Sequence, residues 1–325
     1  MTKSYGNINK LKERIRGEQT LPQSPTVNIK ALEDENRFVE ESVEETANLF
    51  SFEDKAEKPL DITTEMLEET HFIINKITNE IYERDPKQIN YVTKVAEYRG
   101  INPSILLKDK CFYVTSPEYI ETLFSDLPLF KDHLQISTSS NTLWKTRFLI
   151  PIRDFYGKVY GFVGWDKFSN AKYVEYSAEL YKKSTLKVLG LPNVKDIIES
   201  NYIILTEGSF DYYRGIQNGL SIIANLGVSF NKRLKPLLNK VDIVFTAYDS
   251  DKTGIKNMNT IDSLHPNVYH IIFQDIQKIN EDGSTYTSKG DLDEVLKIPE
   301  NVKKLKREIK LRINNPYLKL KDIYI

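Results

Sequence analysis

The sequence contains a single cysteine, Cys111, and only four scattered histidines among its 325 residues. One cysteine excludes an intramolecular disulfide framework, and the histidines lack the paired spacing of a zinc site. No stretch approaches the roughly 18 consecutive apolar residues of a membrane-spanning helix, and the first residues lack the apolar region of a secretory signal. We therefore expect a cytoplasmic protein with no zinc and no membrane partner.

The net charge of −1 conceals two regions of opposite sign. Residues 31–70 are strongly acidic, whereas residues 303–321 are basic. Local patches rather than the overall balance must therefore carry any argument about nucleic-acid affinity. The length and an apolar content of 40% allow a sizeable core in two domains, or in one domain with extensions.

Four regions follow one another along the chain. Residues 1–60 are polar and predict a flexible, acidic segment, and residues 301–325 predict a basic C-terminal helix. Residues 61–195 predict a helical and mixed α+β subdomain, with two strand-like runs at 148–165 that are typical of a hairpin. The predicted helices of this subdomain span residues 61–84, 88–99 and 119–124.

Residues 196–300 alternate between apolar runs and helical patterns. The predicted strands span residues 201–208, 221–227, 241–249 and 267–273. The predicted helices span residues 210–218 and 232–238, a stretch ending near residue 264, and a stretch beginning near residue 292. This alternation predicts βαβ units, and hence an α/β fold whose parallel sheet carries helices on both faces.

Six carboxylates stand where a predicted strand ends or the next helix begins: Glu207 with Asp211, Asp249 with Asp251, and Asp291 with Asp293. Ligands of such a sheet bind beyond the carboxyl ends of its strands, so we expect these side chains to converge at one edge. Converging acids raise one another's pKa, and divalent cations such as Mg²⁺ or Mn²⁺ remove that cost. The pattern predicts a two-metal site for phosphoryl transfer.

A single aspartate after a strand is more often a turn residue or a helix cap than a metal ligand. The recurrence of all six acids with the same placement favours the metal site over that simpler interpretation. The ordered set T-E-G-S-F-D (206–211), A-N-L-G (224–227), Y-D-S-D-K-T-G (248–254) and G-D-L-D-E-V-L (290–296) resembles the TOPRIM domain shared by primases, topoisomerases and some nucleases.

Three further segments distinguish between these proteins. R-F-L-I-P-I-R-D-F-Y-G-K-V-Y-G-F-V-G (147–164), A-K-Y-V-E-Y-S (171–177) and Y-K-K-S-T-L-K-V-L-G-L (181–191) are similar to stretches of bacterial DnaG-type primases. The resemblance implies a TOPRIM domain preceded by a smaller mixed α+β primase subdomain. It also implies synthesis of short RNA primers on single-stranded DNA from ribonucleoside triphosphates, with a replicative helicase as partner.

The resemblance also implies roles for individual acids. Glu207, Asp249 and Asp251 match the central metal ligands or catalytic acids. Asp211, Asp291 and Asp293 match the acids that support them.

Basic residues upstream are expected to hold nucleotide or template. Lys172 and Lys183 match lysines of the family, and Lys182 stays an alternative because that alignment slips by one residue. Arg147 and Arg153 lie among tyrosines and phenylalanines, a mixture that can hold phosphates and stack bases. Aromatic residues on a hairpin are, however, more often ordinary sheet packing.

The sequence departs from the DnaG pattern in two respects. No Cys/His zinc module precedes the catalytic core, and one basic helix takes the place of a helicase-binding domain. We expect a reduced, phage-like architecture, working in the cytoplasm of a bacterium or of a phage-infected host.

Three competing interpretations of the function remain. A TOPRIM nuclease would use water as nucleophile, but it has no reason to carry the segments at 147–177. A topoisomerase would need a longer chain for a strand-passage gate and a marked nucleophilic tyrosine. A non-catalytic subunit that binds single-stranded DNA would gain nothing from six concentrated acids unless metals neutralised them.

The two terminal regions also have alternatives. The acidic residues 33–69 are interpreted as a solvated linker, or else as a mimic of nucleic acid that occupies the basic groove. The basic tail either binds a helicase or DNA, or packs Leu305, Ile309 and Ile313 on the sheet.

Overall fold

The computed structural model describes residues 64–127, 147–169, 172–176, 187–226, 229–249, 251–274, 276–279, 284–288 and 290–325. The predicted flexible segment at residues 1–60 lies outside them, as do Lys182 and Lys183. The described residues divide into two compact units. The first contains Glu68–Pro151 and Gly161–Glu179. The second contains Leu180–Ile325 together with Ile152–Tyr160, which are the tip of a hairpin whose two strands belong to the sheet of the first unit.

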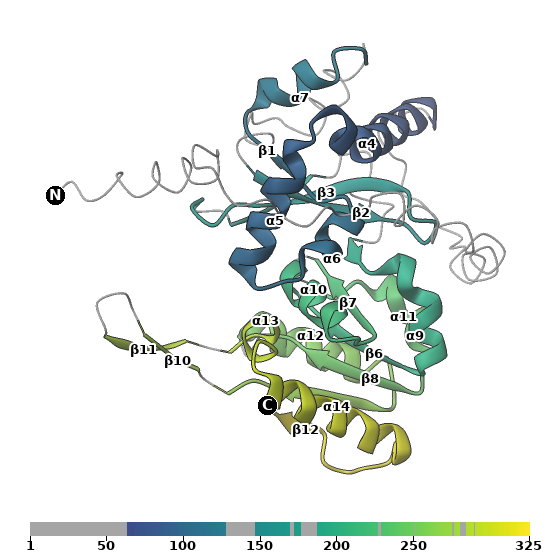
Figure 1. Cartoon of the computed structure of the whole chain (residues 1–325). Helices are drawn as coiled ribbons and strands as arrows, with labels where there is room; N and C mark the ends of the chain where they lie inside the picture. The colour runs from purple at the N-terminus through teal and green to yellow at the C-terminus, as the bar shows by residue number, and fades with distance from the viewer. Residues whose placement is uncertain are drawn as a thin grey trace. The chain divides into compact units, whose positions relative to one another are not determined.

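The first unit combines helices with a four-stranded sheet (Figure 1). Its helices are α4 (Thr64–Arg84), α5 (Lys87–Arg99), α6 (Pro103–Lys108) and α7 (Pro117–Leu123). Its strands, in sheet order, are β1 (Phe112–Val114), β2 (Arg147–Arg153), β3 (Val159–Trp165) and β4 (Tyr173–Tyr176). The predicted hairpin of β2 and β3 is confirmed, and the Asp154 N–H donates to the Lys158 carbonyl at 2.9 Å across its turn.

Three elements of the first unit, α6, β1 and β4, are missing from the sequence-based prediction. α6 begins with a recognisable signal, because the Asn102 side chain accepts from the Ser104 N–H at 3.1 Å and Pro103 takes the first helical position. β1 has only three residues and no periodicity to detect. The buried Gln88 side chain holds it by exchanging hydrogen bonds of 2.9 and 2.8 Å with the Tyr113 backbone.

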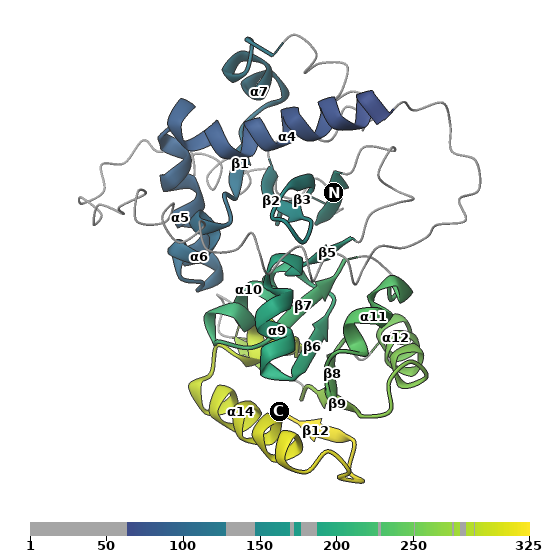
Figure 2. The same ribbon diagram turned by 90° about the vertical axis from the view of Figure 1, so that its right-hand side faces the viewer.

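The second unit is built on a six-stranded sheet in the order β12-β9-β8-β6-β7-β5 (Figure 2). In chain order the strands are β5 (Val188–Leu189), β6 (Tyr202–Thr206), β7 (Ile222–Asn225), β8 (Ile243–Ala247), β9 (Val268–Ile272) and β12 (Asp322–Tyr324). Neighbouring strands pair in parallel, except that β5 at the edge runs antiparallel to β7. The predicted α/β fold with a parallel sheet is confirmed, and β5 and β12 extend that sheet beyond residues 196–300.

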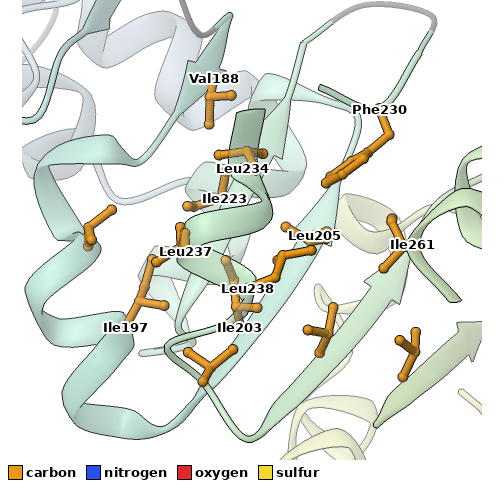
Figure 3. Close-up of a cluster of buried hydrophobic side chains, with 14 of the residues drawn as sticks. Val188, Ile197, Ile203, Leu205, Ile223, Phe230, Leu234, Leu237, Leu238 and Ile261 are labelled. Carbon is orange, nitrogen blue, oxygen red and sulfur yellow. The ribbon is translucent and has the colours of Figure 1, made fainter. Parts of the chain in front are cut away.

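One face of this sheet is covered by α9 (Val194–Ser200), α11 (Lys235–Leu238) and α12 (Lys252–Asp262) (Figure 3). The expected domain boundary between residues 195 and 196 falls inside α9. Alternate residues of the strands point into this layer, as the period of two in a strand requires. Members of this layer include Ile203, Leu205, Ile223, Phe230, Leu234, Leu237, Leu238, Val244 and Ile261.

The opposite face carries α10 (Ser209–Gln217) and α14 (Pro299–Asn314). α10 lies close to β7 at Gly215, which has no side chain. A Cβ at this position would lie 2.7 Å from the Ile222 Cδ1 atom, which is too close. Farther along this face, the aromatic rings of Tyr202, Phe245 and Tyr269 form a row with centroid distances of 6.0 and 5.8 Å. Helices therefore cover both faces, as predicted.

α14 packs on the sheet through a set of residues that the prediction only partly identified. Leu305 and Ile309 are buried as predicted, but Ile313 is 37% exposed and that part of the prediction is wrong. The third buried position is Arg312, whose guanidinium lies 5.0 Å from the Tyr269 ring centroid. An arginine can fill this place because its flat cation stacks on an aromatic face.

No element was predicted between the strand at 267–273 and the helix beginning near residue 292. The structure has an antiparallel pair there, β10 (Ile276–Ile279) and β11 (Thr285–Ser288), followed by the short helix α13 (Leu292–Val295). Threonines and a tyrosine at 285–287, which favour strands, are the sequence signal for β11. No helix in the described part of the chain has both the length and the apolar character needed to cross a membrane.

Candidate active site

The carboxyl edge of the sheet brings the first acid into place. β6 ends at Thr206, which pairs with Ala247 at the end of β8, so the residues after both strands leave the sheet side by side. Glu207 is the first of them, and Gly208 begins the turn into α10. A Cβ at Gly208 would lie 2.5 Å from the Asp211 Oδ2 atom, so this tight turn depends on glycine.

The loop after β8 presents two exposed aspartates. Asp249 is exposed, and Asp251, also exposed, caps α12 by accepting from the Gly254 N–H at 2.8 Å. A Cβ at Gly254 would lie 2.0 Å from the Asp249 carbonyl oxygen, so any larger residue would push the loop backbone away. The cap and the glycine together fix the backbone from which both carboxylates project.

Glu207 lies in a polar environment that has unsatisfied hydrogen-bonding capacity. Its Oε1 atom is buried without a hydrogen-bond partner in the described residues, and the same holds for the Tyr248 hydroxyl and the Asn257 Nδ2 atom. Burial, followed by repulsion from Asp249 and Asp251, raises the pKa of Glu207 to about 7, while the Asn257 amide opposes that rise. Uncompensated polar atoms of this kind mark a place for water or an ion.

Asp211 belongs to a different environment, on the side of α10. Its carboxylate accepts from the Thr206 hydroxyl and the Gly208 N–H, each at 3.2 Å, and from the Asp293 N–H at 2.8 Å. Burial and then Asp291 raise the pKa of Asp211 to about 8, and the Asp293 N–H opposes that rise. Asp249 also raises the pKa of Asp211, as it does that of Glu207, so the two carboxyl groups share one acidic neighbour.

The third pair of acids also performs structural tasks. Asp293 is 1% exposed and accepts from Arg214 Nε at 2.9 Å, in an ion pair between α13 and α10. Asp291 caps α13 by accepting from the Glu294 N–H at 2.7 Å. Within the described residues, no three acidic, histidine or cysteine side chains already stand close enough together to hold one metal ion.

The predicted basic residues occupy unlike positions in the structure. Arg147 is only 6% exposed, and it donates to Ser169 Oγ at 3.0 Å and towards the Lys172 carbonyl at 3.5 Å. Arg153 donates to the Gly157 carbonyl at 2.8 Å and thereby closes the hairpin turn. Lys172 itself is exposed, whereas Lys182 and Lys183 lie outside the described residues.

The two raised pKa values predict how stability depends on pH in the absence of metal. The pKa of a carboxyl group in the unfolded chain is about 4, whereas in the folded state it is about 7 for Glu207 and about 8 for Asp211. At pH values between these limits the folded state therefore binds more protons than the unfolded state. The free energy of unfolding contributed by these groups therefore falls as pH rises.

We expect the wild type in EDTA to lose stability relative to Asp211→Asn between about pH 5 and about pH 8.5, as denaturant titrations of both proteins would measure. Added Mg²⁺ or Mn²⁺ should stabilise the wild type more at the higher pH, because ligand carboxylates must be deprotonated. A stability difference that does not change with pH would contradict the assignment of the raised pKa to Asp211.

The chain is similar to DNA primases over about a third of its length, although no protein-family model matches it. The chain is 29% identical over 113 residues to a DNA primase of Borreliella burgdorferi and 31% identical over 123 residues to a DNA primase of Rickettsia bellii. These matches cover 34% and 35% of this chain but 22% and 20% of the relatives, so they span about a fifth of the relatives' length.

Solved structures extend the likeness over more of the chain. The Aquifex aeolicus primase, with its zinc-binding and RNA polymerase domains, gives a TM-score of 0.59 at 25% identity and covers 77% of this chain and 62% of that one. A DnaG primase catalytic domain bound to single-stranded DNA gives 0.57 at 16% identity and covers 77% and 80%. A DnaG catalytic core gives 0.55 at 18% identity and covers 76% and 79%.

The second unit has a mainly parallel sheet with carboxylates at its carboxyl edge and helices on both faces, as expected for a TOPRIM-type fold. With the four-stranded unit that precedes it in the chain, the protein has the fold of a DnaG-type primase catalytic core.

Sequence reasoning missed three residues that shape this site. Arg214 and Asn257 are ordinary surface-type residues in a sequence, and only their partners 79 and 27 positions away show their use. Asn225 was quoted within A-N-L-G without a role, and its buried side chain bonds the Ser229 carbonyl and the Asn231 N–H at 3.0 and 2.9 Å. The one signal available in the sequence was an asparagine that directly follows an apolar, strand-like run, because a polar side chain at such a place needs hydrogen-bond partners.

Proposed function

We propose that the chain synthesises short RNA primers on single-stranded DNA from ribonucleoside triphosphates, by two-metal nucleotidyl transfer. The observation that carries the proposal is Glu207, a half-buried carboxylate with one unpaired buried oxygen, next to Asp249 and Asp251 in a DnaG-type fold. A buried unsatisfied acceptor costs about 1–3 kcal/mol. A cation at this oxygen would offset that cost and the repulsion between the three acids.

Glu207, Asp249 and Asp251 are the residues that would hold Mg²⁺ or Mn²⁺, since hard cations prefer carboxylate oxygens. Asp249 is exposed, so a change of its rotamer can turn it towards Glu207 without disturbing the core. Asp251 caps α12 through Oδ1, so it would reach a cation through Oδ2. Cations bound there supply activation of the attacking hydroxyl and stabilisation of the leaving pyrophosphate.

The other three acids are assigned a supporting part in the same proposal. Asp211 accepts hydrogen bonds from the end of β6 and from α13, so it ties the Glu207 turn to the last acidic loop. Asp291 caps α13, and Asp293 anchors it to α10 through Arg214. These contacts fix the backbone around the metal ligands and do not themselves require an ion.

The proposal assigns the template to lysines rather than to Arg147, which is buried, or to Arg153, which is half-buried and bonded to the hairpin turn. Lys172 is exposed at the entry to β4, and Lys183, with Lys182 as the alternative, completes the basic set of the proposal. Arg147 bonds to the turn that carries Lys172, and Arg153 closes the hairpin turn, so both are proposed to shape the groove. A DnaG catalytic domain of the same fold is bound to single-stranded DNA. A replicative helicase as partner and a cytoplasmic site of action belong to the same proposal.

A primer-synthesis assay tests the proposal against its alternatives. The full chain is incubated with single-stranded DNA, labelled ribonucleotides and Mg²⁺ or Mn²⁺, with and without a helicase. We expect labelled RNA oligomers that require the metal. Cleavage of the template without labelled RNA would show the TOPRIM nuclease instead, and binding without either reaction would show a non-catalytic subunit.

A further inference from the structure

An open pocket of about 530 Å³ lies beside α12, and none of its lining residues has been given a role above. One wall is a single face of α12, and Lys232 of the short 3₁₀ helix η4 (Lys232–Leu234) also lines the pocket. The lining residues are Lys232, Lys252, Ile255, Lys256, Asn259, Thr260 and Ser263. The α12 members recur three and four positions apart, which is the spacing of one helix face.

The pocket is cationic and its charges are uncompensated. Lys232, Lys252 and Lys256 are exposed and form no ion pair with any acid among the described residues, although three ammonium groups around one hollow repel each other. Ile255, which is 46% exposed, adds an apolar surface between the lysines. The combination suits a ligand that carries both phosphate and a flat apolar group, as a nucleotide does.

The walls of the pocket are held in place by the core. The Asn257 Oδ1 atom on α12 accepts from the Phe230 N–H at 2.9 Å, and the Asn225 Oδ1 atom accepts from the Asn231 N–H at 2.9 Å. Phe230, Leu234 and Ile261 pack in the same hydrophobic cluster behind these contacts (Figure 3). η4 and α12 therefore face the pocket as rigid walls rather than as loose surface segments.

The position of the pocket along α12 indicates what it binds. Lys252 follows Asp251 directly, and the face continues to Ser263, a span of about 16 Å at 1.5 Å per residue. A pocket for a free small molecule encloses most of its ligand, whereas this one is open to solvent along its length. An open, lysine-lined track that starts at the loop of the proposed metal ligands suits a strand whose phosphates pass the reaction site.

We propose that this pocket binds nucleotide phosphates, and that they belong to a single strand of nucleic acid leading to or from the acidic loop. The inference deepens the proposed function and rests on it only for the nature of the ligand. Binding can be measured in EDTA, where no synthesis takes place, so failure of this site and failure of the primase activity are distinguishable.

The test compares two triple variants of the full chain. One carries Lys232→Gln, Lys252→Gln and Lys256→Gln, and the matched control carries Lys303→Gln, Lys306→Gln and Lys310→Gln on the exposed face of α14. Anisotropy of a labelled oligothymidylate is measured between about 50 and about 500 mM KCl. At the low-salt end the pocket variant should bind at least about tenfold more weakly, with a salt slope smaller by about 2, because each single-strand phosphate contact contributes about 0.7.

Equal losses in the two variants would overturn the proposal, since they would show only a general effect of charge, and so would an unchanged pocket variant. Titration with ATP in the same buffer separates the two sources of phosphate. A loss confined to ATP would keep the ligand class but assign the pocket to free nucleotides. As a second measurement, Lys256→Cys can be labelled with a photocrosslinker because the natural Cys111 is buried. Crosslinking of the strand at this position, and not at Lys306→Cys, is the expected result, and equal crosslinking at both would contradict it.

Discussion

Replacing Asp249 with asparagine is expected to reduce primer synthesis by more than about 100-fold, as loss of one electrostatic contact to a transition state does elsewhere. The side chain is exposed at the end of β8, so the fold should persist. The exchange removes one anionic ligand beside Glu207 while keeping the size of the side chain. Incorporation of labelled ribonucleotide measures the rate, and denaturant midpoints confirm the fold.

The matched control is Asp196→Asn, which changes an exposed aspartate on α9 and should keep the wild-type rate. Metal binding gives an independent measurement, because a cation that binds the folded state raises the unfolding temperature. The wild type and Asp196→Asn should gain stability from Mn²⁺, and Asp249→Asn should gain much less. Full synthesis by Asp249→Asn would remove this residue from the active site.

The carboxyl edge of the sheet could be predicted because its signals are local. Apolar runs that end in an acid and a glycine identify both the strand end and the turn, and Gly208 and Gly254 prove to be positions where a Cβ would clash. The Asp251 and Asp291 caps follow the same logic, since an aspartate before a helix satisfies its free N–H groups. The sequence therefore predicted where the acids lie relative to the strand ends and the helix starts.

The grouping of the acids could not be predicted, because it depends on contacts between distant elements. Glu207 and Asp211 are four positions apart and Asp249 raises the pKa of both, yet their partners differ. Glu207 lies near Asn257 on α12, whereas Asp211 bonds to Thr206 and to α13. Arg147 illustrates the same limit, because a basic residue at a strand start gives no sign that it will be 6% exposed. Burial of a long polar side chain depends on partners that no local pattern specifies.

The buried ion pair of Arg214 and Asp293 is expected to contribute the largest single electrostatic effect on stability in the second unit. Both side chains are at most 3% exposed and the Nε–Oδ1 distance is 2.9 Å. Replacement of Arg214 by methionine would leave the Asp293 carboxylate buried without its cation, close to Asp211 and Asp291. Removal of one member of such a pair costs about 3–5 kcal/mol of the free energy of unfolding, which urea titration would measure.

The control for this prediction is the ion pair of Lys297 and Glu294, which has a similar N–O distance of 2.7 Å but lies in a far more exposed position. Lys297→Met should cost about 1 kcal/mol or less, because exposed charges are solvated and screened. The double variant Arg214→Met with Asp293→Leu should recover much of the loss, since the stranded charge is then absent. If Arg214→Met proved no more costly than Lys297→Met, the pair would contribute little to joining α10 and α13. The supporting role proposed for Asp293 would then have to be abandoned, whereas the proposal of Glu207, Asp249 and Asp251 as metal ligands would be unaffected.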